Sequence, residues 1–145
     1  MIILDTNVVS ELLRLAPEPR VEAWLSRQDG GQVYLTAVSE AELRTGVAIM
    51  AAGKRRDDLA HAIDAMLRED FRGRILSFDS AAVSAYAAIA AERRAAGKPI
   101  SQIAAIGRVH RTAIATRNAR DFEGAGIEVV DPWAATWTPT SRPAL

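Results

Sequence analysis

The chain has 145 residues, which is the usual size of a single domain with one hydrophobic core. Hydrophobic residues make up 49%, charged residues 25%, and the formal net charge is zero, which excludes a disordered, collagen-like or disulfide-stapled chain. Because the sequence has no cysteine and no apolar run as long as a membrane span, it excludes disulfides, thiolate zinc sites and membrane insertion, and we expect a cytoplasmic protein.

In the first half of the chain, short apolar runs alternate with helical patterns. The run at 2–4 predicts a buried strand that ends at Asp5, Thr6 and Asn7, polar residues suited to capping the helix that follows. Ser39 and Glu42 have the spacing of a capping box for a later helix. The expected elements are helices at 8–15, 20–27 and 39–52, a strand at 33–36, and a helical pattern through Ile63, Met66 and Leu67.

The second half of the chain continues this alternation. Asp79 or Ser80 is suited to capping a long alanine-rich helix, which we expect to end at Gly97 because Pro99 follows it. Residues 134–145 show no periodicity and predict an irregular tail, which leaves residues 1–133 as the domain. The other expected elements are strands at 74–78, 112–116 and 127–130, a helix at 100–111 and a loop at 117–122.

Strands separated by helices predict an α/β fold. Right-handed crossovers then give a short parallel sheet flanked by helices on both faces, with Trp24 and Trp133 expected in the core. In such a sheet, ligands bind beyond the carboxyl ends of the strands. The polar residues directly after each apolar run are therefore the candidates for a functional site.

Three of these positions carry a carboxylate. Asp5 follows the first strand, Glu42 lies in the helix after the second, and Asp121 lies in the loop after the strand at 112–116. The sequence has no glycine-rich phosphate loop and only two histidines, in separate predicted helices, which disfavours a nucleotide-cofactor site, a serine triad and a histidine zinc site. Clustered carboxylates are typical of a site for a hard divalent cation such as Mg²⁺, which can polarise a phosphodiester and activate a water.

Each carboxylate also has an ordinary structural interpretation. Asp5 could cap the first helix, Glu42 could complete the capping box, and Asp121 could be a turn residue. For each residue taken alone, the structural interpretation is the better one. Because the three residues fall at three strand ends, we favour a common site.

Basic residues are concentrated late in the chain. From Arg93 to Arg120 there are seven lysines and arginines and no Asp or Glu, whereas the first seventy residues carry twelve acidic and eight basic residues. A solvated helix face is the more ordinary interpretation of this bias. A surface that binds a polyanion is the alternative.

Three stretches of the sequence resemble the signature motifs of PIN-domain ribonucleases, and within that family the VapC/FitB branch of toxin–antitoxin toxins. They are IILDTNVVSE at 2–11, AELRTG at 41–46 and ATRNARDF at 115–122. The resemblance implies a PIN-like three-layer fold and an endoribonuclease that depends on Mg²⁺ or Mn²⁺ and cleaves RNA. It also implies a homodimer and a cognate antitoxin as protein partner.

The resemblance further assigns roles to individual residues. It makes Asp5, Glu42 and Asp121 the catalytic, metal-binding acids. The polar residues that match the supporting positions are Thr6, Asn7, Thr116 and Asn118. Arg117 and Arg120 are candidates for contact with RNA phosphates, or equally with an acidic neighbour.

One segment departs from the family pattern. Where the family resembles I-S-Q-x-D-A-x-I-A-A-I-A, with an aspartate that contributes to the metal site, this chain reads ISQIAAIG at 100–107. About four residues, close to one turn of helix, are missing together with that aspartate. The place of the aspartate falls on Ala104 or on Ile100, according to the end from which positions are counted, and neither side chain binds metal. The departure implies an intact fold with a weaker metal site.

Two functions remain open at this point. The first is a ribonuclease toxin in which Asp5, Glu42 and Asp121 hold Mg²⁺. The second is a PIN-fold module that binds its antitoxin or RNA but cleaves weakly or not at all, because one acid of the family is absent. RNA cleavage that requires Mg²⁺ and is lost on Asp5→Ala distinguishes the first from the second.

Overall fold

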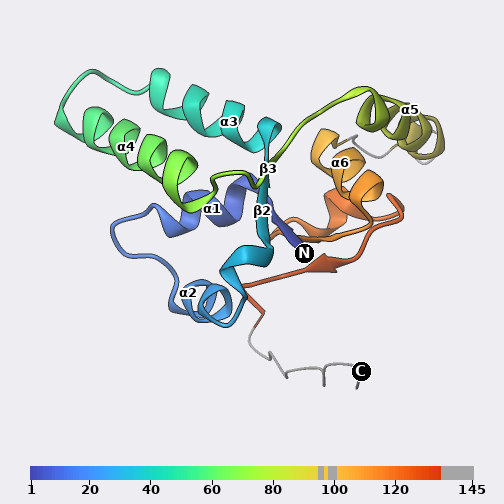
Figure 1. Ribbon diagram of the computed structural model, residues 1–145, viewed down its shortest axis with the longest axis horizontal. Helices are drawn as coiled ribbons and strands as arrows, with labels where there is room; N and C mark the ends of the chain where they lie inside the picture. Colours follow the sequence, from blue (N-terminus) through green and yellow to red (C-terminus); the bar gives the residue numbers. More distant parts are fainter. Residues whose placement is uncertain (95–96, 98–100, 135–145) are drawn as a thin grey trace.

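The structure is a computed structural model that describes residues 1–94, 97 and 101–134. In this part of the chain, five strands form one parallel sheet in the order β3-β2-β1-β4-β5 (Figure 1). The predicted α/β fold class is therefore confirmed. The strands are β1 (Ile2–Leu4), β2 (Val33–Thr36), β3 (Ile75–Leu76), β4 (Ala113–Ala115) and β5 (Val129–Val130).

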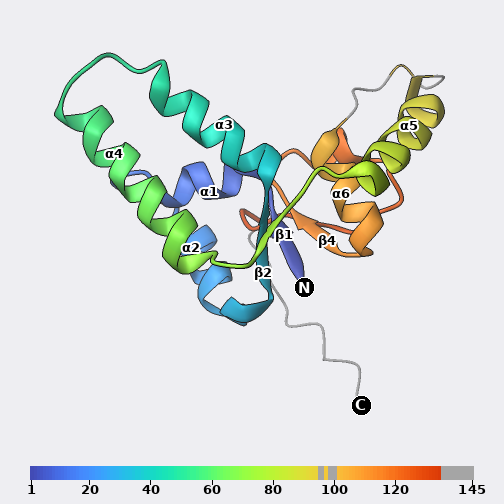
Figure 2. The same cartoon turned by 45° about the horizontal axis from the view of Figure 1, so that its top comes forward.

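Helices cover both faces of the sheet and give the molecule three layers. Helices α1 to α4 lie on one face, and α5 and α6 pack against each other on the other face (Figures 1 and 2). The hairpin of α3 and α4 extends away from the sheet (Figure 2). The helices are α1 (Thr6–Leu12), α2 (Pro19–Ser26), α3 (Ala37–Ala48), α4 (Lys54–Ala65), α5 (Ser80–Arg94) and α6 (Gln102–His110), with short turns η1 (Gly30–Gln32), η2 (Met66–Asp70) and η3 (Ala119–Phe122).

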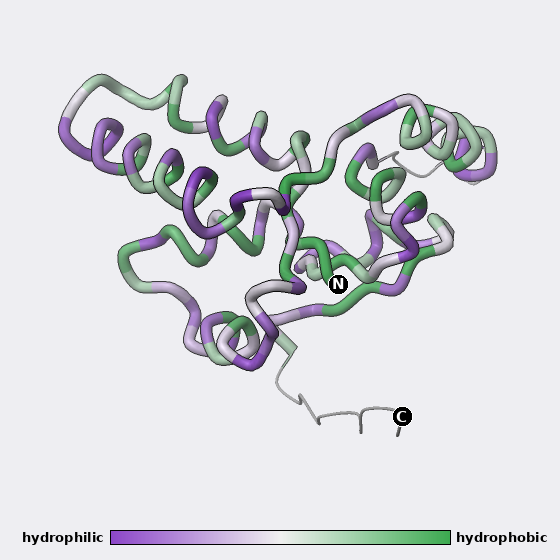
Figure 3. The backbone as a smooth tube through the Cα atoms, in the orientation of Figure 1, coloured by the Kyte–Doolittle hydropathy of each residue, from purple (hydrophilic) through white to green (hydrophobic). Residues whose placement is uncertain are grey.

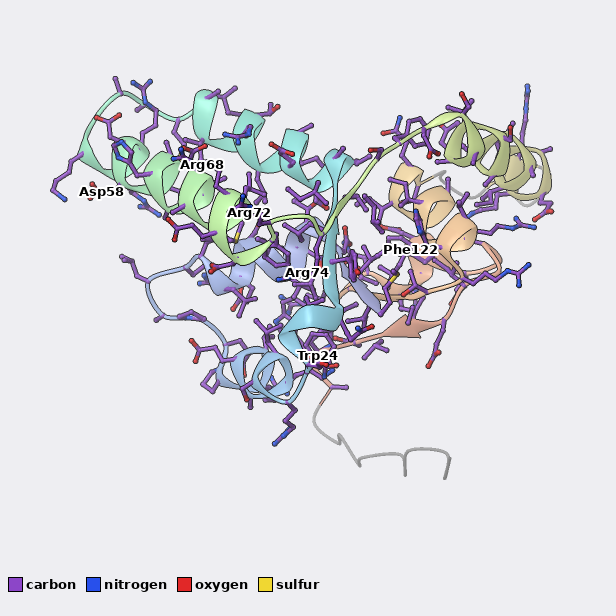
Figure 4. The ribbon with its side chains drawn as sticks, viewed as in Figure 1. Trp24, Asp58, Arg68, Arg72, Arg74 and Phe122 are labelled. Atoms are coloured by element: carbon purple, nitrogen blue, oxygen red, sulfur yellow. The ribbon has the colours of Figure 1, made fainter. Side chains whose placement is uncertain are left out.

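Side chains that alternate along the strands divide the core in two. Ile3 packs on the α5–α6 side and its neighbour Leu4 on the α1–α4 side, and both are fully buried. Figure 4 labels one member of each core, Trp24 of α2 and Phe122 of η3, on opposite sides of the sheet. Trp24 is buried as predicted. Figure 3 shows hydrophobic residues gathered where the strands pass through the centre, with hydrophilic residues recurring along α4.

The helix after β2 begins earlier than its sequence pattern predicts. Thr36 is the N-cap of α3, and its Oγ1 accepts a hydrogen bond from the backbone N–H of Ser39 (3.1 Å). Ser39 thus lies inside the first turn, and the predicted capping box of Ser39 and Glu42 is wrong. Glu42 therefore has no capping role.

Most other elements are shorter than predicted. α1 begins at Thr6 because Asp5 caps it, and it ends at Leu12 rather than at residue 15. α3 ends at Ala48 rather than at residue 52, and α4 begins at Lys54, directly after Gly53. β3 and β5 are reduced to the two residues that pair with their neighbouring strands.

The end of α5 leads to the segment that departs from the family pattern. The helix ends at Arg94, and Gly97 has a φ of 66°, the left-handed conformation for which glycine is favoured. Residues 95–96, 98–100 and 135–145 lie outside the described residues, and with them lie Ile100 and nearly all of the predicted tail. In the described part of the chain, no helix is both long and apolar enough to cross a membrane.

Candidate active site

One open cavity of about 990 Å³ lies at the carboxyl ends of the central strands, and we call it the acidic pocket. Asp5, Glu42 and Asp121 all line it. Asp5 follows β1, Glu42 comes from α3, and Asp121 comes from η3, which follows β4. The structure thus brings together the three acids that the sequence places at separate strand ends.

Asp5 is the most firmly held of the three acids. It is half-buried and is the N-cap of α1, with Oδ1 accepting a hydrogen bond from the backbone N–H of Thr6 (2.8 Å). Its Oδ2 accepts hydrogen bonds from Thr116 Oγ1 (2.6 Å) and Asn7 Nδ2 (3.0 Å). Both carboxylate oxygens are therefore fixed by donors from α1 and β4.

Burial dominates the ionisation of Asp5. It raises the pKa of the Asp5 carboxyl above its ordinary value, and the hydrogen bonds from Thr116 and Thr6 oppose this effect. The charges of Glu42 and Asp121 add to the rise in the Asp5 pKa. The three carboxylates therefore interact electrostatically across the pocket, and a cation placed among them would relieve their repulsion.

Thr116 ties Asp5 to the loop that carries Asp121. Its hydroxyl is fully buried, donates to Asp5 and accepts hydrogen bonds from Asn7 Nδ2 (3.2 Å) and the backbone N–H of Asn118 (3.1 Å). The backbone carbonyl of Asn118 in turn accepts a hydrogen bond from the Asp121 backbone N–H (3.0 Å). Of the residues predicted to support the acids, Thr6, Asn7 and Thr116 therefore contact Asp5, and Asn118 contacts Asp121.

A second polar network joins α1 to α3. Thr6 Oγ1 donates to Ser39 Oγ (2.9 Å), and Ser39 is held at the start of α3 by Thr36. Ser39 is fully buried and precedes Glu42 by about one helical turn, so this network fixes the part of α3 that presents Glu42. This role of Ser39 could not be predicted from the sequence, because the spacing of Ser39 and Glu42 favoured a helix N-cap.

The three acids do not form a preassembled metal cage. In the part of the chain that the structure describes, no group of three Asp, Glu, His or Cys residues is placed to hold a metal ion. The donor set is nevertheless one of carboxylate oxygens, and Mg²⁺ is commonly bound by only one or two carboxylates while it keeps several waters. The site therefore fits a hydrated cation better than an ion ligated directly by all three acids.

The α6 side of the pocket supplies no acid. Ser101, Gln102 and Ile103 line it there, and Ser101 caps α6 by accepting a hydrogen bond from the Ala104 backbone N–H (3.2 Å). Ala104 is fully buried in the core beneath α6, so it also presents nothing to the pocket. This is the segment from which an aspartate of the family pattern is missing.

The opposite end of the pocket is cationic and aromatic. Arg14 pairs with the nearly buried Glu11 (3.1 Å), and this hydrogen bond holds the pKa of Glu11 below its ordinary range. The Arg117 guanidinium lies over the Trp133 ring, 5.3 Å from its centroid, and both residues line the pocket. Trp133 is therefore a partly buried wall residue rather than the full core residue that we predicted, whereas Arg120 is exposed and does not line the pocket.

Comparisons with known proteins give one consistent result. The family model described as PIN domain matches residues 2–127. VapC ribonuclease Y4jK of Sinorhizobium fredii is 40% identical to this chain over 137 residues, which cover 92% of this chain and 98% of that protein. Toxin FitB of Neisseria gonorrhoeae is 41% identical over 137 residues, which cover 92% of this chain and 99% of that protein.

A solved structure agrees with these relatives. The crystal structure of FitAcB from Neisseria gonorrhoeae contains a chain that is 41% identical and superposes with a TM-score of 0.86, covering 92% of this chain and 99% of that chain. The similarity therefore extends over nearly the whole chain, rather than over isolated motifs.

Proposed function

The chain belongs to the PIN-domain family, on its VapC/FitB branch, and from this membership we propose that it is a toxin that cleaves RNA with the help of a divalent cation. The single observation that carries this proposal is the convergence of Asp5, Glu42 and Asp121 on one pocket at the carboxyl ends of parallel strands. That is the position at which open α/β sheets bind their ligands.

Each residue of the site has a defined task in this proposal. A bound Mg²⁺ or Mn²⁺ would supply a Lewis acid and an activated water. Asp5, held by Thr6, Asn7 and Thr116, would be the fixed carboxylate that holds the cation, and the exposed Glu42 and Asp121 would complete the carboxylate set around the ion or its waters. Asn118 and Thr116 keep the loop with Asp121 in place.

A second function is favoured by one specific observation. The α6 side of the pocket carries Ser101, Gln102 and Ile103 and no carboxylate, so the site has fewer acids than the family pattern. The alternative is a PIN-fold module that binds an antitoxin or RNA and cleaves weakly or not at all.

We also propose the partners that this family membership implies. The similar proteins are named as a VapC ribonuclease and a FitB toxin, and solved structures with a similar fold are described as a toxin–antitoxin complex and as a member of the VapBC family of toxin–antitoxin systems. The expected partners of this chain are therefore a cognate antitoxin and a second copy of itself. A monomer at micromolar concentration in analytical ultracentrifugation would contradict the homodimer.

The first experiment compares two aspartates that both cap helices. Asp5→Ala is expected to abolish Mg²⁺-dependent cleavage of a structured RNA. Asp79→Ala is the matched control, because Asp79 Oδ1 accepts a hydrogen bond from the Ala82 backbone N–H (3.0 Å) at the start of α5, outside the acidic pocket. Loss of this cap is expected to lower the free energy of unfolding by about 1 kcal/mol without changing cleavage.

The outcome separates the two functions. Cleavage by the wild type and by Asp79→Ala, but not by Asp5→Ala, supports the ribonuclease. Absence of any cleavage that depends on Asp5, in a wild-type protein that still binds RNA or antitoxin, supports the binding module instead.

A further inference from the structure

Arg117 is an arginine at the wall of the acidic pocket whose charge is not neutralised by a carboxylate. Among the described residues it forms no salt bridge, whereas Arg14, the other arginine of the pocket, is paired with Glu11 at 3.1 Å. Glu11 and Glu18 are near enough for the Arg117 charge to lower their pKa values, yet neither is its ion-pair partner. The guanidinium therefore retains hydrogen-bond donors for a ligand.

One aromatic contact positions this guanidinium. It lies over the indole ring of Trp133, 5.3 Å from the ring centroid, which is a cation–π contact. The ring is held in turn, because the Trp133 backbone N–H donates to Asp131 Oδ1 (2.9 Å) and the side chain packs against the core on the α1–α4 side. Arg117 is thus presented by a rigid platform.

The backbone of Arg117 is linked to the acidic centre. The Arg117 backbone N–H donates a hydrogen bond to Asn7 Oδ1 (3.4 Å). Asn7 Nδ2 donates a hydrogen bond to Asp5 Oδ2 (3.0 Å). One asparagine therefore spans the distance between Arg117 and the most firmly held acid. Because Asp5 and Arg117 also line the same pocket, one ligand in that pocket can contact both.

Electrostatics favours a phosphate as this ligand. The three carboxylates of the pocket repel a polyanion, so a nucleic-acid strand needs a cation beside them to stay bound. Arginine binds phosphate through its planar donors, and a guanidinium plane can also stack on a base. We propose that Arg117, held by Trp133, forms a subsite that binds the phosphate adjacent to the one being cleaved in a single-stranded segment of RNA.

This inference rests on the proposed function for its choice of RNA, and binding without metal tests it separately. The probe is a labelled single-stranded RNA of mixed sequence, titrated by fluorescence anisotropy in EDTA at several NaCl concentrations. Arg117→Met is expected to weaken binding about tenfold, the effect of one charge-assisted contact. It should also reduce the slope of log K against log salt by about 0.7, as expected for one phosphate contact on a single strand.

Three further variants make the test specific. Trp133→Leu removes the platform and is expected to weaken binding about three- to fivefold, whereas Trp133→Phe keeps a ring and should bind nearly as the wild type does. Arg72→Met is the matched control, because Arg72 is also exposed but lies on the α4 side of the sheet, outside the acidic pocket (Figure 4). It should leave both the Kd and the salt slope unchanged.

The results distinguish failure of the subsite from failure of the proposed function. If the wild type binds and cleaves RNA but Arg117→Met has the wild-type Kd and salt slope, the subsite is wrong and the ribonuclease stands. If Arg72→Met weakens binding as much as Arg117→Met, the effect is one of overall charge and the subsite is also wrong. If the wild type neither binds nor cleaves RNA, both proposals are overturned.

Discussion

Asp5 is a half-buried carboxyl group and Arg93 is a buried guanidinium. The two side chains differ in how many hydrogen bonds they receive or donate. Asp5 accepts hydrogen bonds from three donors, on Thr6, Asn7 and Thr116. Arg93 of α5 is only 2% exposed, and among residues 1–94, 97 and 101–134 none of its three guanidinium nitrogens has a hydrogen-bond partner. One charge is supported by a network and the other has none.

The two sides of the acidic pocket also differ in how their polar groups are held. The α1–α3 side carries Asp5, Glu42 and the Thr6–Ser39 link, so its polar groups are both present and positioned. In the part of the chain that the structure describes, neither α5 nor α6 supplies an acid to the pocket, and the guanidinium of Arg93 in α5 is buried without a hydrogen-bond partner. A buried ion that lacks partners destabilises a fold by several kcal/mol, whereas a partnered one can be close to neutral. The comparison teaches that the site is complete on one side only.

The largest expected effect comes from restoring the missing helical turn on the α5–α6 side. This change tests whether the absent aspartate limits cleavage. Insertion of Asp-Ala-Gln-Ile after Ile103 returns one acid and one helical turn within the first turn of α6. Affinity for a hard cation rises with the number of charged ligands, so cleavage at low Mg²⁺ is expected to increase about 100-fold, or ~2.7 kcal/mol. The measurement is cleavage of a structured RNA against Mg²⁺ concentration.

The insertion needs Asp5→Ala in both backgrounds as its control. Without Asp5, neither the native chain nor the insertion variant should cleave. If the native chain cleaves at low Mg²⁺ as fast as the insertion variant, the missing aspartate is unimportant and the two sides of the pocket are not unequal in the way inferred here.

Removal of the buried Arg93 charge tests the α5–α6 side through the free energy of unfolding. Arg93→Met keeps a long apolar stem and removes the buried guanidinium, so it is expected to raise the free energy of unfolding by about 2 kcal/mol. Arg94→Met is the matched control, since Arg94 is the next residue in α5 but is exposed. Urea unfolding of the two variants gives the comparison. A loss of stability in Arg93→Met would show that the guanidinium has a stabilising partner.

The layers of this fold could be predicted from the sequence because they depend only on the periodicity of apolar residues and on the order of strands and helices along the chain. The apolar runs at β1, β2 and β4 and the helical patterns between them were sufficient for a parallel sheet, and for locating Asp5 and Asp121 at strand ends. Element boundaries were less accurate. Thr36 caps α3 although Ser39 had the better local pattern, because the chain leaves β2 at Thr36 and tertiary position overrides local spacing.

The parts of the pocket that sequence did not predict depend on contacts between distant residues. Thr6 and Ser39 are 33 positions apart, and only the packing of α1 on α3 brings their hydroxyls together. Arg117 and Trp133 likewise meet only because the chain returns through β5. Single residues of these types carry no sequence signal of such contacts. From the sequence, Arg117 was a candidate for contact with RNA phosphates or with an acidic neighbour, but its contact with Trp133 was not predicted.

The smallest expected effect concerns the donor that supports Asp5 on the complete side of the pocket. Since burial raises the pKa of Asp5 and the Thr116 hydroxyl lowers it, Thr116→Val should raise that pKa further. Cleavage requires Asp5 in its ionised form, so activity falls as the pH drops through this pKa. The acid limb of the pH–rate profile should therefore move to higher pH, by about one unit for the loss of one hydrogen bond to a charged group. Thr112→Val is the control at the other end of β4, where the hydroxyl of Thr112 donates to the Met1 carbonyl (2.9 Å), and its profile should match the wild type. An acid limb that stays in place in Thr116→Val would mean that Asp5 does not control the reaction through its ionisation, and the half-buried carboxylate would then be a helix cap only.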